Sequence, residues 1–406
     1  MSKNYKLDFP IFKNHPDLIY LDSAATSLSP EGVIEAEARY AKEFGTNALR
    51  GLYPLAEQTD AYIHQIRKDV AGFIGALPEE IIFTSGTTHG LNLLAQSLAR
   101  TLKESGNIVV TNQEHHANFL PWKELALEQG HDFRCARSTQ EGFIDADHLL
   151  KLINKDTHAV ALSAVSNVYG VINNLSPLVA QIRELSPDAF IVIDAAQVAP
   201  HLPINVTDIN ADALVFSGHK MYGPTGVGVL WLSSSAQAKL YPGFVGGGMV
   251  LDALATPPVY KENYEKFEVG TLNLSGIFGL GAAIHYIEKI GFENIRSHEQ
   301  ELLRYALLKL TQTFGEKITF LGSTNTAEKI GVLAFTIAGV HPHDIASALG
   351  KKNICVRAGE HCASPLHNER GLGATTRLSF GIYTEKSDID ACVEALKEAV
   401  TLFEKK

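Results

Sequence analysis

A carboxylate and a lysine each follow a short apolar run, and the two runs lie close together in the sequence. Residues 190–193 lead directly into Asp194, and residues 213–216 lead into a polar segment that ends at Lys220. Short apolar runs bounded by turn residues are typical of buried parallel strands, and ligands bind at the carboxyl ends of such strands. The sequence therefore predicts that Asp194 and Lys220 lie at the same edge of a sheet, on neighbouring strands.

This combination of side chains has a specific chemical use. Pyridoxal phosphate needs a lysine that forms its Schiff base and a carboxylate that keeps its ring nitrogen protonated. Taken alone, either Asp194 or Lys220 fits a strand end that faces water better than it fits a cofactor site. The pyridoxal phosphate interpretation therefore depends on the motifs around the pair.

A glycine turn with hydroxyl side chains follows another predicted strand, at residues 80–84. Ser85, Gly86, Thr87 and Thr88 lead from this strand into a helix. The free N–H groups and the positive end of the dipole at a helix start can bind a phosphate group. Serine and threonine are also ordinary helix-capping residues, so the motif is compatible with a phosphate site without requiring one.

Two more predicted strands end in residues that suit a flat, polar ligand. Residues 108–111 lead to His115 and His116, a pair that could bind a metal, but no third ligand accompanies it at a convincing spacing. We therefore predict no metal site and expect one imidazole to stack on a cofactor ring. Residues 159–163 lead to Asn167, which suits a hydrogen bond to a ring oxygen but is also a common turn residue.

The composition argues against several classes of protein. The 406 residues, 45% hydrophobic and 20% charged, predict a globular protein with two domains or with one large and one small. A net charge of -10 without a basic run argues against a nucleic-acid partner. No apolar run approaches the ~18 residues of a membrane span, no signal peptide is apparent, and four cysteines make no disulfide framework. We therefore expect a cytoplasmic protein without membrane association.

The last third of the chain has a different pattern. Residues 276–290 and 295–314 have the apolar spacing of amphipathic helices, and shorter strands are predicted at 332–337, 354–356 and 377–380. These elements predict a separate C-terminal α+β unit beside the parallel sheet.

Seven motifs, in order along nearly the whole chain, resemble one family. They are SGTTHGLN, QEHHANFLPW, VSNVYG, IDAAQ, SGHKMYGPTG, FEVGTLNLSG and RAGEHCASPL. Together they resemble the class V aminotransferase-fold enzymes that use pyridoxal phosphate, in particular cysteine desulfurases of the SufS type. The resemblance implies a homodimeric α/β protein of fold type I. Its large domain, residues 22–287, would hold a mainly parallel seven-stranded sheet, and residues 1–21 with 288–406 would form a small α+β domain.

The resemblance also implies roles for individual residues. Lys220 would be the Schiff-base lysine, Asp194 would pair with the ring nitrogen, and His115 would stack on the ring. Gln197 and Asn167 would contact the phenolic oxygen. The phosphate would be held by Thr87, Thr88, Ser217 and His219, with Thr271 reaching the phosphate of the partner subunit. The substrate carboxylate would pair with Arg377, and the pocket would also be lined by Arg50 and Arg357.

Only one of the four cysteines lies in a context that favours reactivity. Cys355 and Cys392 lie in an apolar run and a predicted helix, where we expect them to be packed, and Cys135 has no evident partner. Cys362 lies in a polar, basic loop, where a thiolate is favoured and accessible. In the resembling family this position holds the sulfur-accepting cysteine.

The implied reaction converts L-cysteine to L-alanine and leaves the sulfur on Cys362 as a persulfide. The sulfur would then pass to an acceptor protein, for iron–sulfur cluster assembly or related sulfur trafficking. In some relatives a histidine of an HPHD motif meets a zinc-bearing, scaffold-like acceptor, and His343 matches that residue. The same motif is also compatible with a plain helix start, with Asp344 near the positive end of the dipole.

Four positions depart from the family pattern. Leu49 replaces a frequent histidine, Met249 a frequent serine, His89 an acidic residue and Glu360 another histidine. Leu49 and Met249 fall near the expected substrate sulfur, so they favour the alternative of another class V lyase, acting on selenocysteine or cleaving carbon–sulfur bonds. A non-enzymatic assembly partner is the second alternative, and the intact Lys220, Asp194 and Cys362 argue against it.

Overall fold

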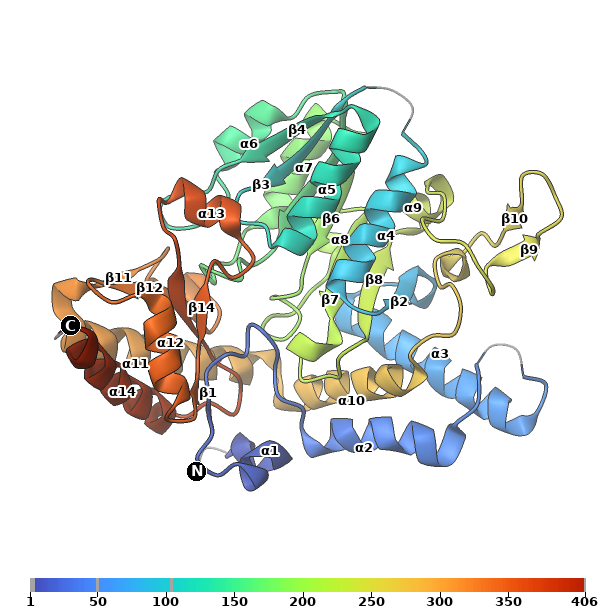
Figure 1. The fold of residues 1–406 in the computed structure, drawn as a ribbon. Coiled ribbons are helices and arrows are strands. Elements are labelled where there is room, and N and C mark those ends of the chain that lie inside the picture. The colour runs from blue at the N-terminus through green and yellow to red at the C-terminus, as the bar shows by residue number, and fades with distance from the viewer. Residues whose placement is uncertain (1–3, 49–50, 103–104, 405–406) are drawn as a thin grey trace.

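A seven-stranded sheet runs through the middle of the larger part of the molecule (Figure 1). The computed structural model describes residues 4–48, 51–102 and 105–404. In spatial order the strands are β2 (Ile81–Thr84), β8 (Gly228–Leu232), β7 (Ala213–Ser217), β6 (Phe190–Asp194), β5 (Thr157–Ser163), β3 (Asn107–Thr111) and β4 (Asp132–Ala136). The run from β7 to β4 is parallel, and β8 is antiparallel to both of its neighbours. The predicted α/β fold with a mainly parallel seven-stranded sheet is confirmed.

Both faces of this sheet are buried, as its apolar strands require. Successive side chains of a strand point to opposite faces, so Ile191 and Ile193 of β6 join one apolar cluster and Phe190 and Val192 join another. Helices α4 (Thr87–Ala99) and α5 (His116–Gln129) cover the second face. The first face is covered by α3 (Pro54–Ile74), α6 (Ala146–Leu152), α7 (Leu175–Leu185) and α10 (Leu274–Ile290).

The C-terminal part of the chain forms a second, antiparallel sheet, drawn in orange and red in Figure 1. Its strands, in spatial order, are β11 (Ile318–Phe320), β12 (Val332–Ile337), β15 (Thr375–Ser379) and β14 (Arg357–Gly359). Three helices supply its apolar core together with these strands, namely α11 (Phe292–Phe314), α12 (Pro342–Gly350) and α14 (Lys386–Glu404). The short helix α13 (Ser364–Glu369) lies between β14 and β15 in the chain.

The beginning of the chain joins this C-terminal part. Strand β1 (Ile19–Tyr20) pairs in parallel with β13 (Ile354–Cys355). However, the apolar cluster of the large sheet also contains Phe9, Val332 and Tyr383, so the two parts share packing. The division at residues 22–287 therefore stays a prediction.

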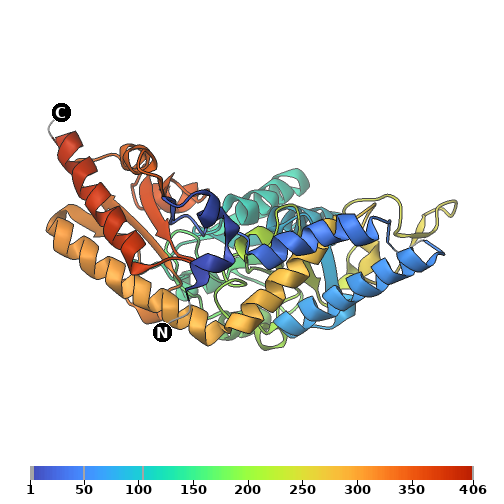
Figure 2. The same ribbon diagram turned by 90° about the horizontal axis from the view of Figure 1, so that it is seen from below.

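Two long helices connect the two sheets. Figure 2 shows α10 and α11 following one another across the molecule, beside α2 (Glu31–Arg39) and α3. Gly291 separates them with a φ of 82°, a backbone conformation that favours glycine. Because of this turn α11 begins at Phe292, three residues before its predicted start.

The other α-helices and strands of the described chain are short. They are α1 (Pro10–Asn14), α8 (Val206–Ile209), α9 (Ser234–Lys239) and the hairpin of β9 (Val250–Asp252) and β10 (Val259–Tyr260). Cys392 is buried in α14 as predicted, whereas Cys355 is only partly buried because β13 is a two-residue strand with one neighbour. Across the described ranges, no helix is both long and apolar enough to span a membrane.

Candidate active site

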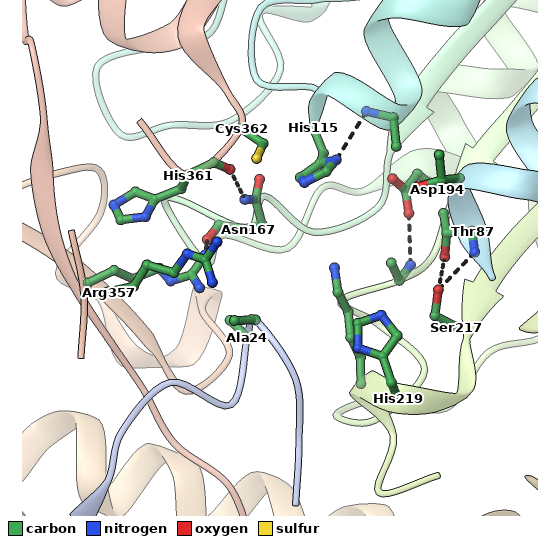
Figure 3. A pocket seen from close by; sticks show the side chains of 16 residues that line it. Ala24, Thr87, His115, Asn167, Asp194, Ser217, His219, Arg357, His361 and Cys362 are labelled. Atoms are coloured by element: carbon green, nitrogen blue, oxygen red, sulfur yellow. Dashed lines mark hydrogen bonds between the residues drawn. The ribbon is translucent and has the colours of Figure 1, made fainter. Parts of the chain in front are cut away.

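A cavity of about 170 Å³ opens at the carboxyl ends of the central strands, where the second sheet approaches the first (Figure 3). Strands β6 and β7 deliver Asp194 and the segment up to Lys220, while β14 and β15 deliver two arginines. The structure brings most of the predicted site residues together in its wall: Thr87, Thr88, His115, Asn167, Asp194, Ser217, His219, Lys220, Arg357, Cys362 and Arg377.

Asp194 and Lys220 influence each other's charge across the cavity. The Asp194 carboxylate is buried and accepts a hydrogen bond from the Ala196 N–H at 2.9 Å. Burial raises the pKa of Asp194, and the nearby Lys220 ammonium opposes that rise. Burial also lowers the pKa of Lys220, against the attraction of Asp194. Lys220 is therefore available as a neutral amine at lower pH than an ordinary lysine.

A group of donors suited to an anion lies at the start of α4. The Thr87 N–H donates to Ser217 Oγ at 2.8 Å, and the two hydroxyl oxygens lie 2.7 Å apart. Gly86, which precedes the helix, has a φ of 145°, and a Cβ there would lie 3.3 Å from Ser217 Oγ. His89, one of the positions that depart from the family pattern, accepts a hydrogen bond from the Ser85 N–H through its Nδ1 at 3.0 Å. These contacts fix a turn whose hydroxyl groups, together with the N-terminus of α4, can bind the anionic end of a ligand.

Two neutral imidazoles face the same cavity. Burial, reinforced by the charge of Lys220, lowers the pKa of His115 to about 3. The same two causes lower the pKa of His219 to about 4. His115 Nδ1 accepts a hydrogen bond from the Ala117 N–H at 3.1 Å, which fixes the ring at the start of α5. A fixed, uncharged ring of this kind suits stacking on a flat ligand.

Arg377 is held in the cavity wall by two partners. Its Nη1 donates to the Asn167 carbonyl oxygen at 3.0 Å, and its Nη2 donates to Asp22 Oδ1 at 3.1 Å. Arg357 Nη1 lies 3.7 Å from the other oxygen of Asp22. The Arg377 side chain is only 2% exposed, and its Nε has no hydrogen-bond partner, so a donor remains for an anionic ligand.

Sequence reasoning missed Asp22 and His361. Burial raises the pKa of Asp22, while Arg377 and Arg357 oppose the rise, so this carboxylate partly neutralises both arginines. His361 lines the cavity and bonds Thr375 Oγ1 at 2.8 Å. The only sequence signal for Asp22 was its place at the end of a short predicted strand.

Three predicted residues are not part of the described cavity wall. Gln197 lies behind the wall, where its amide donates to the Ala24 carbonyl at 2.9 Å and its Oε1 is buried without a partner. Thr271 lines a separate cavity with Gly247 and Gly248. Arg50 lies outside the described residues. The roles assigned to these three residues stay predictions.

The other three residues that depart from the family pattern lie in different parts of the chain. Leu49 lies outside the described residues. Met249 is fully buried, and its sulfur lies 3.3 Å from the Gly246 N–H, so it packs within its own glycine loop. Glu360 accepts from the Ala363 N–H through its backbone oxygen at 2.9 Å and closes the turn around Cys362.

The residues around the cavity fit pyridoxal phosphate. A lysine and a carboxylate line the same cavity, a neutral ring lies in the same wall, and hydroxyls gather at a helix start. Among the described residues, no three His, Cys, Asp or Glu side chains are grouped so that they could hold a metal ion.

The fold and this arrangement define a class of protein. The chain belongs to the aminotransferase class-V family, whose sequence pattern matches residues 19–392. Full-length relatives in that class are named as cysteine desulfurases. The cysteine desulfurase of Pectobacterium atrosepticum is 37% identical over 398 residues, covering 97% of this chain and 96% of that protein. A probable cysteine desulfurase of Halalkalibacterium halodurans is 41% identical over 403 residues, covering 97% of each chain.

Solved structures agree with this assignment. The apo cysteine desulfurase of Thermococcus onnurineus matches with a TM-score of 0.91 at 35% identity, covering 100% of this chain and 99% of that one. The cysteine desulfurase CsdA of Escherichia coli, solved with an S-sulfonic acid, matches with a TM-score of 0.90 at 32% identity, covering 98% of each chain.

Proposed function

We propose that this protein is a pyridoxal phosphate-dependent cysteine desulfurase of the SufS type, which moves sulfur from L-cysteine to its own Cys362. The observation that carries the proposal is that the exposed Cys362 opens onto the same cavity as Lys220, Asp194 and Arg377. A reducing, cytoplasmic setting suits such a thiol.

The side chains described above would hold the cofactor. Asp194 would face its ring nitrogen, His115 its ring, and Thr87, Thr88, Ser217 and His219 its phosphate. When bound through Lys220, pyridoxal phosphate supplies an electron sink that weakens bonds at the α- and β-carbons of an amino acid. Gln197 and Asn167 remain candidates for the phenolic oxygen. The Asn167 amide nitrogen donates one of its two hydrogens to the His361 carbonyl at 2.8 Å, which leaves the second N–H for that contact.

Substrate binding and proton transfer would be carried out by three side chains. Arg377 would bind the substrate carboxylate through its free donor, with Asp22 fixing the orientation of the guanidinium. Lys220, with its lowered pKa, would take the α-proton as a neutral amine and hold it at Nζ. Arg357, which is half-exposed, would contribute positive charge at the mouth of the pocket. Arg50 would line the same pocket.

In the proposed sulfur transfer, the atoms and electrons balance without any further reactant. The Cys362 thiolate attacks the sulfur of L-cysteine, so a sulfur–sulfur bond forms at Cys362 and the carbon–sulfur bond of the substrate breaks. The carbon receives a proton and leaves as L-alanine, and Cys362 keeps the sulfur as a persulfide. An acceptor protein then takes this sulfur, for iron–sulfur cluster assembly or a related use.

Product analysis tests this function. We expect L-cysteine to give alanine and, in mass spectra, one added sulfur atom on the peptide that contains Cys362. A Cys362→Ser variant is the control and should add none. Pyruvate and ammonia in place of alanine would indicate a carbon–sulfur lyase, and strong preference for selenocysteine would indicate a selenocysteine lyase. A purified protein without cofactor absorbance would favour the non-enzymatic alternative.

We predict that Thr271 completes the phosphate site of a partner subunit in a homodimer. The support is its position in a cavity separate from that of Lys220. If Thr271 acts across the dimer, mixing Thr271→Ala chains with Lys220→Ala chains should restore activity, because one site of each mixed dimer is then intact. Activity that stays at the level of the separate variants, or a fully active monomer in light scattering, would contradict the prediction.

We further predict that His343 contacts a zinc-bearing, scaffold-like acceptor. His343 is exposed, and a Cβ on Gly359, in the strand leading to Cys362, would lie 3.7 Å from its Nε2. His343→Ala should leave desulfuration driven by a small reductant unchanged. It should reduce stimulation by a zinc-bearing acceptor roughly tenfold or more, because the loss of even an indirect metal contact costs about 10- to 100-fold. His341→Asn is a matched control, because His341 caps α12 and asparagine preserves a capping oxygen. Equal stimulation of wild type and His343→Ala would contradict this prediction, and the acceptor would then remain unidentified.

A further inference from the structure

The backbone around Cys362 adopts a conformation that needs support. His361 and Cys362 have φ values of 52° and 56°, in the left-handed region that few residues other than glycine adopt. Two successive residues of this kind persist only where neighbouring groups hold them. The described contacts of the loop therefore show what fixes the thiol over the cavity.

On the side of the large sheet, His116 at the start of α5 makes several contacts with this loop. Its backbone N–H donates to the Cys362 carbonyl oxygen at 2.7 Å. Its Nε2 accepts from the Ser364 N–H at 3.2 Å and lies 2.8 Å from the Ser364 hydroxyl. Ser364 is the first residue of α13, and Ala363 before it provides no side-chain cap. The His116 imidazole thus satisfies a helix-start N–H that the loop itself leaves without a partner.

The second sheet holds the other side of the same loop. His361 Nε2 and His367 Nε2 lie 2.8 and 3.2 Å from Thr375 Oγ1, in the strand that also carries Arg377. His367 Nδ1 lies 3.1 Å from the Ala363 carbonyl. His116 therefore connects this loop to the cofactor side of the cavity, because its neighbour in the chain is His115. The Asn167 amide, which donates to the His361 carbonyl at 2.8 Å, is another connection.

From these contacts we infer that His116 is a positioning residue for sulfur transfer. It holds Cys362 over the cavity through Ser364 and the Cys362 carbonyl, and it ties that position to the helix start that carries His115. This inference rests on the proposed function, since it assumes that Cys362 accepts sulfur. It assigns the first histidine of the His115–His116 pair to the ring of the cofactor and the second to the loop.

The inference predicts a specific pattern of effects for His116→Ala in the cofactor-loaded enzyme. Persulfide formation on Cys362 in a single turnover should slow by about tenfold, the size expected for a lost hydrogen bond. The KM for L-cysteine and the cofactor absorbance should not change, because His116 does not line the cavity. His116→Gln, which keeps a side-chain acceptor, should recover most of the rate.

Two further measurements separate positioning from a general loss of stability. Hydrogen exchange of the peptide spanning residues 360–369 should become several-fold faster in His116→Ala, while exchange in residues 190–194 of β6 should not change. The double variant His116→Ala/Ser364→Ala should be no slower than His116→Ala alone, because both changes remove the same contact. His64→Ala, at an exposed histidine of α3, serves as an unrelated control.

The outcomes are distinguishable. A wild-type protein that forms no persulfide on Cys362 would overturn the proposed function and this inference with it. Persulfide formation at the wild-type rate in His116→Ala, with unchanged exchange of residues 360–369, would overturn the inference alone. Faster exchange of β6 as well would show that His116 acts on the stability of the whole sheet, which also overturns it.

Discussion

Replacing Lys220 with alanine is expected to abolish the release of alanine from L-cysteine. Lys220 lines the same cavity as Asp194, and burial lowers the pKa of its amine, which favours a role as a base. In the proposed reaction Lys220 attaches the cofactor covalently and takes the α-proton, so alanine at this position would remove both functions. Because both functions belong to one amine, we expect the loss to be complete within the detection limit of the assay.

The spectrum of the purified variant provides a second measurement. Lys220→Ala should lack the absorbance of lysine-bound pyridoxal phosphate, and the wild-type protein should show it. Lys239→Ala, at an exposed lysine of α9, is the matched control and should retain both absorbance and turnover. Alanine release at the wild-type rate from Lys220→Ala would show that the pyridoxal phosphate assignment is wrong.

Replacing Arg377 with alanine should raise the KM for L-cysteine strongly. A charge-assisted hydrogen bond to a carboxylate contributes about 1.5–3 kcal/mol, which corresponds to roughly a 10- to 150-fold change in KM. The buried setting of Arg377 favours the upper part of that range, since little solvent screens the contact. Steady-state kinetics with L-cysteine as the varied substrate measure the effect.

Two variants test the geometry of this contact. Arg377→Lys keeps the charge but loses the planar fork, so its KM should lie between those of wild type and Arg377→Ala. Arg357→Ala should have a smaller effect, because the Arg357 side chain is 47% exposed and its charge is screened by solvent. An unchanged KM in Arg377→Ala would remove this residue from the substrate site.

The parts of the site that sequence predicted best are those fixed by local structure. Asp194 and Lys220 follow apolar strands directly, so the direction of a parallel sheet is enough to place them at one edge. Thr87 and Ser217 meet for the same reason, at the ends of β2 and β7. Gln197 is further from its strand end, and its turn carries it behind the wall of the cavity.

The parts that sequence missed depend on contacts between distant segments. Asp22 and Arg377 are 355 positions apart in the chain, and no local pattern reports their pairing. The contact between His116 and Ser364 likewise spans the two sheets. The antiparallel direction of β8 was also not predicted, because an apolar run has the same alternation whichever way its neighbours point.

The pairing of β1 with β13 affects how the protein is made. The N-terminal end of a chain leaves the ribosome first. Ile19 and Tyr20 therefore emerge long before their pairing partners, Ile354 and Cys355. During this interval Asp22 has neither arginine beside it. The corner of the pocket formed by Asp22, Arg357 and Arg377 is therefore assembled only after the strand that carries Arg377 has left the ribosome. Until then a nascent chain contains Lys220 and Asp194 but lacks the arginine to which we assign the substrate carboxylate.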